Sequence, residues 1–298
     1  IMVAKLLTTS ISAPGFYGLN TQDSVVSLES GYATVATNCV IDKFGRIGAR
    51  KGWTPAHSTL GALGSNAVES IAELIANDGT SYIVAAGNNK LFKLSGSTLS
   101  ELTYGGGGTA PTITANDWQM APLNGVLYIY QEGHDPLVFD PAVSSTTYRR
   151  VSEKSGYVGT VSNNNCVISA YGRTWTATNG SNKTTIQFSD LSAGYILSTG
   201  TAGTLDVASV WPAGADEIVA LAAHNGFLIV FGRRQILIYN NAQEPASMSL
   251  QDAITGIGCF ARDSVVTTGS DVYFLSDSGV KSLMRTIQEK SAPLRDIS

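Results

Sequence analysis

One unit of sequence recurs along the chain and constrains its fold more than any other feature. In the copy from Ala215 to Asn241, three apolar runs are separated by Asn225-Gly226 and then by a Gly-Arg-Arg segment at 232–234. Short runs rich in Val, Ile, Leu, Phe and Tyr favour β-strands. Asn-Gly between two such runs favours a tight hairpin turn, because both residues tolerate positive φ angles. This copy therefore predicts a three-stranded antiparallel meander, which cannot bury both of its faces alone.

The same unit occurs five times, each time around a glycine in its first turn. These glycines are Gly79, Gly125, Gly172, Gly226 and Gly269, at intervals of 46, 47, 54 and 43 residues. A period of about 40–50 residues is typical of β-propeller blades, which are small sheets that pack face to face around an axis. We therefore predict an all-β protein, a β-propeller built of four-stranded antiparallel blades.

Two domains are predicted. Residues 1–60 lack the repeating unit and form an irregular N-terminal arm with one hairpin, in which Thr37–Asp42 and Arg46–Lys51 flank a turn containing Gly45. Residues 61–298 form the blades, with residues 191–215 interpreted as an insertion, either a loop or a hairpin, on one blade. Because no further unit follows the fifth, we expect the propeller to be incomplete at the C-terminus. Closure of the ring by N-terminal strands is the alternative.

The composition argues against several classes of protein. Only 14% of the residues are charged, and 23 acidic residues outnumber 19 basic ones, whereas a dedicated nucleic-acid binder normally has a basic face. No apolar run approaches the roughly 18 residues that span a bilayer. The N-terminus lacks the sustained apolar segment of a secretory signal peptide.

Residues with potential for catalysis or metal binding are scattered. His57, His134 and His224 do not have the spacing of metal ligands, and the three cysteines are too widely spaced to indicate a disulfide framework or a metal cluster. The Gly105–Gly108 run lacks the lysine of a phosphate-binding loop, so we interpret it as a flexible link between the first two blades. We predict no enzymatic activity, no cofactor and no metal site.

Three short segments are candidates for contacts with partners. The pairs Arg149-Arg150 and Arg233-Arg234 lie at strand ends or turns, where they could contact DNA phosphates or an acidic partner, or could simply be solvated. Trp211 lies in the expected insertion and could anchor a contact with a neighbouring subunit, since aromatic residues are enriched in interface cores. Burial of Trp211 within its own blade is the alternative.

The N-terminal region resembles a known family. The segment "APGFYGLNTQDS" followed by "ATNCVIDKFGRIGARKGW" is similar to the N-terminal signature of tail nozzle (tail tubular) proteins of short-tailed bacteriophages. Two later segments, "EIVALAAHNGFLIVFGRRQILIYNN" and "SDVYFLSDSGVKSLMRTIQEKSAPLRDIS", look like blades of the same proteins. The positions that match the signature are Gly18, Leu19, Asn20, Thr21, Ala36, Asn38, Gly45, Arg46, Ile47, Arg50 and Gly52.

This resemblance implies a structural role in the tail of a virion. Nozzle proteins form a hexameric ring below the adaptor (the head-to-tail connector), surround the channel through which double-stranded DNA leaves, and help to hold tail fibres or spikes. We therefore expect a homo-hexamer whose arm docks on the adaptor or closes the propeller. Candidate partner-binding residues are Gly18, Leu19, Asn20, Thr21, Arg46 and Arg50. Family members are usually longer than 298 residues, which also suggests that this chain is part of a longer protein.

Two other functions remain open. A carbohydrate-binding β-propeller for host-surface recognition would need exposed aromatic residues gathered on one face, whereas the four tryptophans are scattered along the sequence. A propeller hydrolase would need two convergent carboxylates. The acidic composition is compatible with a channel that repels DNA weakly, although it could equally serve only solubility.

Overall fold

The computed structural model describes residues 16–52, 54, 61–114, 118–178 and 180–288. The chain divides into two compact units, 1–56 and 57–298, with the boundary four residues before the expected one. Residues 1–15 and Trp53, which belong to the expected arm, lie outside the described residues.

The N-terminal unit contains two small sheets. Strand β1 (Gly18–Leu19) pairs in parallel with β2 (Tyr32–Ala33), and β3 (Cys39–Ile41) forms an antiparallel hairpin with β4 (Ile47–Ala49). The hairpin turn contains Gly45 at a φ of 76°, a left-handed conformation that suits a residue without a Cβ atom. The hairpin thus lies where the sequence predicts it, with shorter strands.

The described part of the second unit starts with the 3₁₀ turn η1 (Gly61–Leu63) and continues in five mainly antiparallel sheets. The first sheet contains β5 (Ser70–Ile75), β6 (Ser81–Gly87), β7 (Lys90–Ser95) and β8 (Thr98–Glu101). The second contains β10 (Trp118–Leu123), β11 (Val126–Gln131), β12 (Leu137–Phe139) and β13 (Thr147–Arg150), with β9 (Thr103–Tyr104) added in parallel to β13. The third contains β14 (Cys166–Ala170), β15 (Arg173–Ala177), β16 (Thr185–Phe188) and β17 (Gly203–Asp206).

The fourth sheet contains β18 (Ile218–His224), β19 (Phe227–Gly232), β20 (Gln235–Asn240) and β21 (Ser249–Thr255). The last contains β22 (Val266–Thr267), β23 (Val272–Ser276) and β24 (Gly279–Ser282), and helix α1 (Leu283–Gln288) follows it. Three further 3₁₀ turns are η2 (Val151–Glu153), η3 (Pro245–Ser247) and η4 (Arg262–Ser264).

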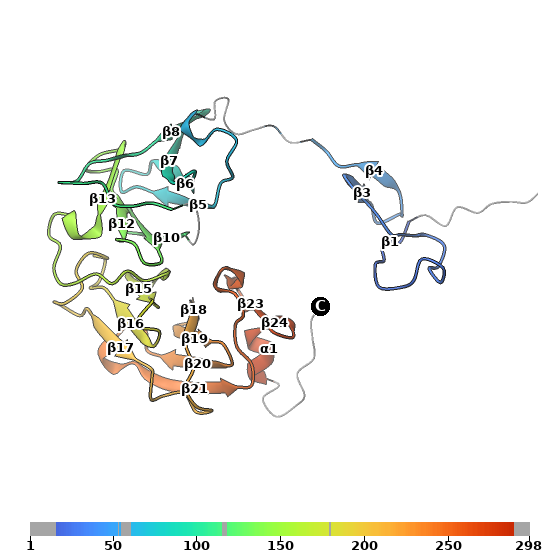
Figure 1. Cartoon of the computed structure of the whole chain (residues 1–298). Coiled ribbons are helices and arrows are strands. Elements are labelled where there is room, and N and C mark those ends of the chain that lie inside the picture. The colour runs from blue at the N-terminus through green and yellow to red at the C-terminus, as the bar shows by residue number, and fades with distance from the viewer. Residues whose placement is uncertain (1–15, 53, 55–60, 115–117, 179, 289–298) are drawn as a thin grey trace, which may run out of the picture. The chain divides into compact units, whose positions relative to one another are not determined.

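The five sheets are arranged as the blades of a β-propeller. The first strand of each sheet contacts the first strand of the next, in the order β5, β10, β14, β18 and β22, and the sheets follow an arc in Figure 1. Three blades have four strands, the second has a fifth strand, and the described part of the last has three. The predicted fold, an all-β propeller of antiparallel four-stranded blades, is therefore confirmed.

The five glycines that revealed the repeat all lie in the first turn of a blade. Gly79, Gly125, Gly172 and Gly226 have φ values between 71° and 84°, the left-handed region that a tight hairpin requires. Gly269 precedes β23 without a left-handed φ.

Residues 191–215 differ from the expected insertion. Strand β17 lies within this segment and pairs with β16, with Leu205 opposite Ile186. The segment therefore supplies the fourth strand of the third blade, with loops on either side. The pattern did not reveal this strand because Gly203–Asp206 holds a single apolar residue.

The core lies between neighbouring sheets. Leu74 and Val84 of the first sheet pack against Leu127 and Ile129 of the second, and all four are at most 1% exposed. Burial of such side chains contributes about 1.5–3 kcal/mol each, relative to full exposure. The face-to-face contact of sheets is therefore the main source of stability.

Phe231 provides a test of this packing. It is fully buried, and its ring centroid lies 4.9 Å from that of Phe274, which joins the fourth sheet to the last. Phe231→Ala should lower the free energy of unfolding by about 3–5 kcal/mol, because a cavity remains. Urea denaturation measures this loss. The control Val143→Ala, at an exposed loop position, should stay within about 0.5 kcal/mol of the parent; equal effects of the two variants would contradict the packing.

Candidate interaction site

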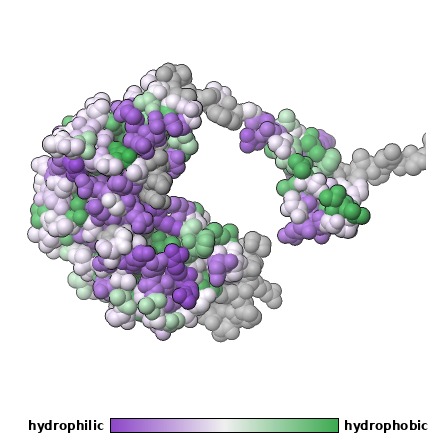
Figure 2. Space-filling view, viewed as in Figure 1, coloured by the Kyte–Doolittle hydropathy of each residue, from purple (hydrophilic) through white to green (hydrophobic). Residues whose placement is uncertain are grey.

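The described part of the N-terminal unit has no buried core of its own. None of residues 16–52 is buried. Figure 2 shows hydrophobic residues at the surface of this unit, and the exposed large apolar side chains are Phe16, Tyr17, Leu19, Val25, Val26, Tyr32, Val35, Val40, Phe44 and Ile47. An isolated two-stranded sheet is marginally stable at best in water, and exposed apolar patches mark interaction sites. These properties make the unit the strongest candidate for an interaction site.

The predicted residues Gly18, Leu19, Asn20 and Thr21 lie in and directly after β1. Leu19 and Thr21 are exposed. The Asn20 carboxamide oxygen accepts hydrogen bonds from the backbone amides of Gln22 (3.1 Å) and Asp23 (3.2 Å), and its amide nitrogen donates to the Asp23 carboxylate at 2.8 Å. Asn20 thus shapes the turn after β1, a common role for asparagine.

The tip of the β3–β4 hairpin is basic and aromatic. The Lys43 ammonium lies 5.1 Å from the centroid of the exposed Phe44 ring, and the Arg46 guanidinium carbon lies 5.7 Å from it. Residues 38–52 hold four basic residues and one acidic residue, a net charge of +3, whereas residues 57–298 hold 14 basic and 20 acidic residues, a net charge of −6. Arg46 and Arg50 are both exposed. The hairpin therefore presents positive charge beside apolar surface.

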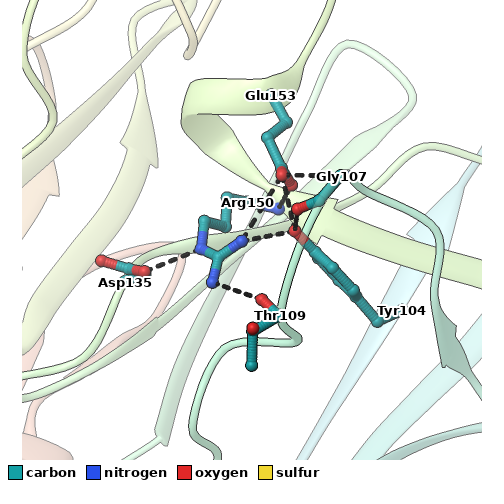
Figure 3. Close-up of polar contacts among 6 residues, drawn as sticks. All are labelled: Tyr104, Gly107, Thr109, Asp135, Arg150 and Glu153. Atoms are coloured by element: carbon teal, nitrogen blue, oxygen red, sulfur yellow. Dashed lines mark hydrogen bonds and ion pairs between the residues drawn. The ribbon is translucent and has the colours of Figure 1, made fainter.

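Arg150 is held inside a polar cluster at the end of β13 (Figure 3). Its Nε donates to the Asp135 carboxylate and its Nη2 to the carbonyl oxygen of Thr109, both at 2.8 Å. Its Nη1 donates to the Tyr104 hydroxyl and lies 3.4 Å from the Glu153 carboxylate. Two carboxylates thus pair with Arg150 within the second blade, and its contact with DNA or an acidic partner stays a prediction.

The same cluster holds the Gly105–Gly108 run, which was expected to be a flexible link. Glu153 accepts a hydrogen bond from the backbone amide of Gly107 at 3.1 Å and one from the Tyr104 hydroxyl at 2.5 Å. A Cβ atom at Gly106 would lie 2.1 Å from the Glu153 carboxylate. The run is therefore tied to the second blade, and its small residues permit this close approach.

The cluster keeps Arg150 and Glu153 charged and Tyr104 neutral. The hydrogen bond to Asp135 is the largest influence that raises the pKa of Arg150. Burial, followed by the hydrogen bond to Glu153, raises the pKa of Tyr104. Burial alone would also raise the pKa of Glu153, but hydrogen bonds from Tyr104 and from the backbone amides of Arg150 and Gly107 outweigh it and lower that pKa.

The remaining predicted arginines do not form one basic surface. Arg149 is half-buried in β13. Arg233 forms an ion pair with Glu217, which also pairs with Lys183 at 2.8 Å. Arg234 is exposed, and its backbone amide donates to the Asp216 carboxylate at 2.9 Å. Arg150 and Arg233 thus have separate carboxylate partners, in the second and the fourth sheet.

Trp211 is not available as an exposed anchor. Its side chain is 6% exposed and packs in the cluster between the third and fourth sheets, with Phe188 and Val230. The expected contact of Trp211 with a neighbouring subunit is therefore wrong, because the loop after β17 turns the indole toward the core. Trp118 and Trp175 are buried as well, so no described tryptophan offers an exposed platform for a sugar.

Arg262 in η4 joins three parts of the propeller and was not singled out in the sequence. Its guanidinium donates to the carbonyl oxygens of Asn165 (2.5 Å) and Trp118 (3.4 Å), and it pairs with Asp263. It borders a cavity of about 470 Å³ between the inner strands, together with Gln119, Ser169, Ala222 and Thr267. Among the described residues that line this cavity, Asp263 is the only one with a carboxylate. A lone arginine in "FARDS" has no pattern that reveals this position.

Other kinds of site find little support in the described part of the chain. No group of three or more His, Cys, Asp or Glu side chains there could hold a metal ion. Cys166 and Cys259 are buried free thiols, and burial raises the pKa of Cys166 to about 12, while Cys39 is half-buried in the hairpin. No described helix is both long and apolar enough to cross a bilayer.

Comparison with known proteins gives only distant similarities of fold. No protein-family model and no curated protein matches the chain. YCF48 bound to D1 peptide shows 14% identity and a TM-score of 0.43, over 67% of this chain and 59% of that chain. BBS1N in complex with ARL6DN shows 11% identity and a TM-score of 0.43, over 72% and 62%. The chain thus covers about three fifths of each, and similarities at this level assign no function.

The Glu153 cluster predicts a dependence of stability on pH. Because the pKa of Glu153 lies below its ordinary value of 4.5 in the folded protein, its ionised form stabilises the fold above about pH 4.5. This contribution is lost as the pH falls through the lower folded value. In Glu153→Gln, the urea midpoint should therefore fall less between about pH 5 and pH 3 than in the parent. The exposed Glu244→Gln should follow the parent, and a parallel decline in all three would contradict the assignment.

Proposed function

We propose that the chain is a non-enzymatic structural protein of a bacteriophage tail, a subunit of the hexameric nozzle ring through which DNA leaves the capsid. The observation that carries this proposal is the N-terminal unit. The residues that resemble the nozzle signature lie in a segment without a single buried residue between positions 16 and 52. Such a segment is suited to contacts with other proteins rather than to a core of its own.

The propeller supports a mechanical role. Large apolar side chains fill the spaces between its sheets, and the fully buried ones include Trp175, Tyr130, Phe139 and Phe231. Charged residues near strand ends form ion pairs within their own region of the propeller: Arg150 pairs with Asp135, and Glu217 pairs with Lys183. A closely packed and internally paired domain resists deformation, as the wall of a channel must.

The proposed partners follow from this role. Residues 16–35, which include Gly18, Leu19, Asn20 and Thr21, are the candidate contact with the adaptor, and exposed Leu19 and Val26 offer the apolar surface for it. Tail fibres or spikes and the transient DNA are the other partners. The site of action is the tail of the virion.

The position in the particle is the direct test of this proposal. Gold-labelled antibody raised against the purified chain, applied to disrupted virions, should mark a six-fold ring at one capsid vertex in negative-stain electron microscopy. An antibody against the major capsid protein serves as the control and should mark the shell. Label on the shell or only at fibre tips would contradict the proposal, and retention of the chain on a glycan array would favour carbohydrate binding.

A second prediction concerns DNA. A conduit must pass a polymer with one negative charge per about 1.7 Å without holding it. The propeller residues 57–298, with a net charge of −6, should therefore bind a 30-base-pair duplex with a dissociation constant weaker than about 100 µM at about 0.15 M salt. Fluorescence anisotropy measures this. Micromolar binding that weakens steeply with salt would contradict a channel that does not grip DNA.

A further inference from the structure

In the described part of the chain, the first sheet of the propeller has one face without a neighbouring sheet. Ile71, Ile75 and Ile83 point to the same side, because Ile71 and Ile75 are four residues apart in β5 and Ile83 lies opposite Glu73, between them. Their exposed fractions are 65%, 63% and 37%. The other side of the same sheet, with Leu74 and Val84, is buried against the second sheet.

The later sheets show what normally covers this side. In the second sheet, the side directed toward the preceding sheet carries Leu127 and Ile129, which are at most 1% exposed. In the first sheet, η1 covers only the half formed by the outer strands, through the contact of Leu63 with Phe92 and Leu99. The half formed by β5 and β6 is an apolar surface that elsewhere in this fold lies against β-structure.

The open face combines apolar and acidic side chains, and these properties indicate which partner fits it. Besides the three isoleucines it carries the exposed Glu73, and the exposed Glu69 lies just before β5. The β3–β4 hairpin has the complementary properties. One of its sides is apolar, since Ile41 pairs with Ile47 and Cys39 with Ala49, and its flanks carry the basic residues Lys43, Arg46, Arg50 and Lys51.

We propose that the β3–β4 hairpin of one copy docks on the open face of the first sheet, formed by Ile71, Ile75, Ile83 and Glu73, of the neighbouring copy. The choice of a second copy rests on the proposed ring of subunits. A contact between two different patches is heterologous, and heterologous contacts close into rings when the rotation permits. The hairpin gains the cover that a two-stranded sheet needs for stability, and each copy both gives and receives one contact.

Disulfide trapping between two tagged forms of the chain tests this contact. Both forms carry Cys39→Ser, which leaves Cys166 and Cys259 buried. One form adds Ile47→Cys on the apolar side of the hairpin, and the other adds Ile75→Cys in the open face. After mixing and mild oxidation, a non-reducing gel should show the mixed dimer. The matched control replaces Ile75→Cys by Val143→Cys, an equally exposed position on a loop, and should give at least about tenfold less of it.

A charge exchange tests the pairing itself. Arg46→Glu or Glu73→Lys alone should weaken self-association. In sedimentation velocity, each single variant should reach half-assembly only at a several-fold higher protein concentration than the parent. The double variant should restore self-association. The proposal is overturned if the mixed dimer is no more abundant than with the control. It is also overturned if a single chain that carries Ile47→Cys and Ile75→Cys forms its disulfide internally at high dilution. Neither result touches the position of the protein in the virion, which the antibody labelling decides separately.

Discussion

Face-to-face packing of small sheets is the interaction on which the propeller depends. Each sheet has apolar side chains on both sides, so one neighbour covers only half of them. Tyr128 and Leu127 are adjacent in β11, yet Leu127 packs toward the first sheet and Tyr128 toward the third. Because successive side chains of a strand point to opposite faces, this one strand contacts both neighbouring sheets and thus links three sheets. Among the described sheets, the first packs against a neighbouring sheet on one side only.

Charged residues in this protein act mainly at the junctions between elements. Arg150 ties the glycine run to the second blade, and Arg262 joins η4 to the backbones of the second and third blades. Such charge-assisted hydrogen bonds are stronger than neutral ones and hold loops that have little apolar surface. The few charges of this chain are therefore used for architecture, which agrees with a proposed role in the wall of a channel.

The N-terminal unit differs from the propeller, because the apolar side chains of its described part are not packed between sheets. Its strands are two or three residues long, and its apolar side chains, such as Val26 and Phe44, remain exposed. Local bonds, such as those from the backbone amides of Phe44 and Arg46 to the Asp42 carboxylate, shape its turns without giving it a core. The exposed apolar side chains of its described part are suited to burial against partners, and both the proposed adaptor contact and the proposed contact between copies would use this property.

The sequence by itself determined the repeat, the turns and the fold class, because these depend on residues close together in the chain. Asn225-Gly226 specifies a hairpin through φ angles alone. The same pattern, apolar runs on either side of a turn glycine, located the first turn of every blade. Only the tertiary structure decided the pairing of β17, the ion pairs of Arg150, the burial of Trp211 and the hydrogen bonds of the Gly105–Gly108 run. Strand β17 is held by pairing with β16 rather than by its own pattern, and Glu153 reaches Gly107 across 46 residues of chain. Whether a charged or aromatic side chain is buried, paired or exposed depends on neighbours that are distant in sequence, and local pattern carries no information about them.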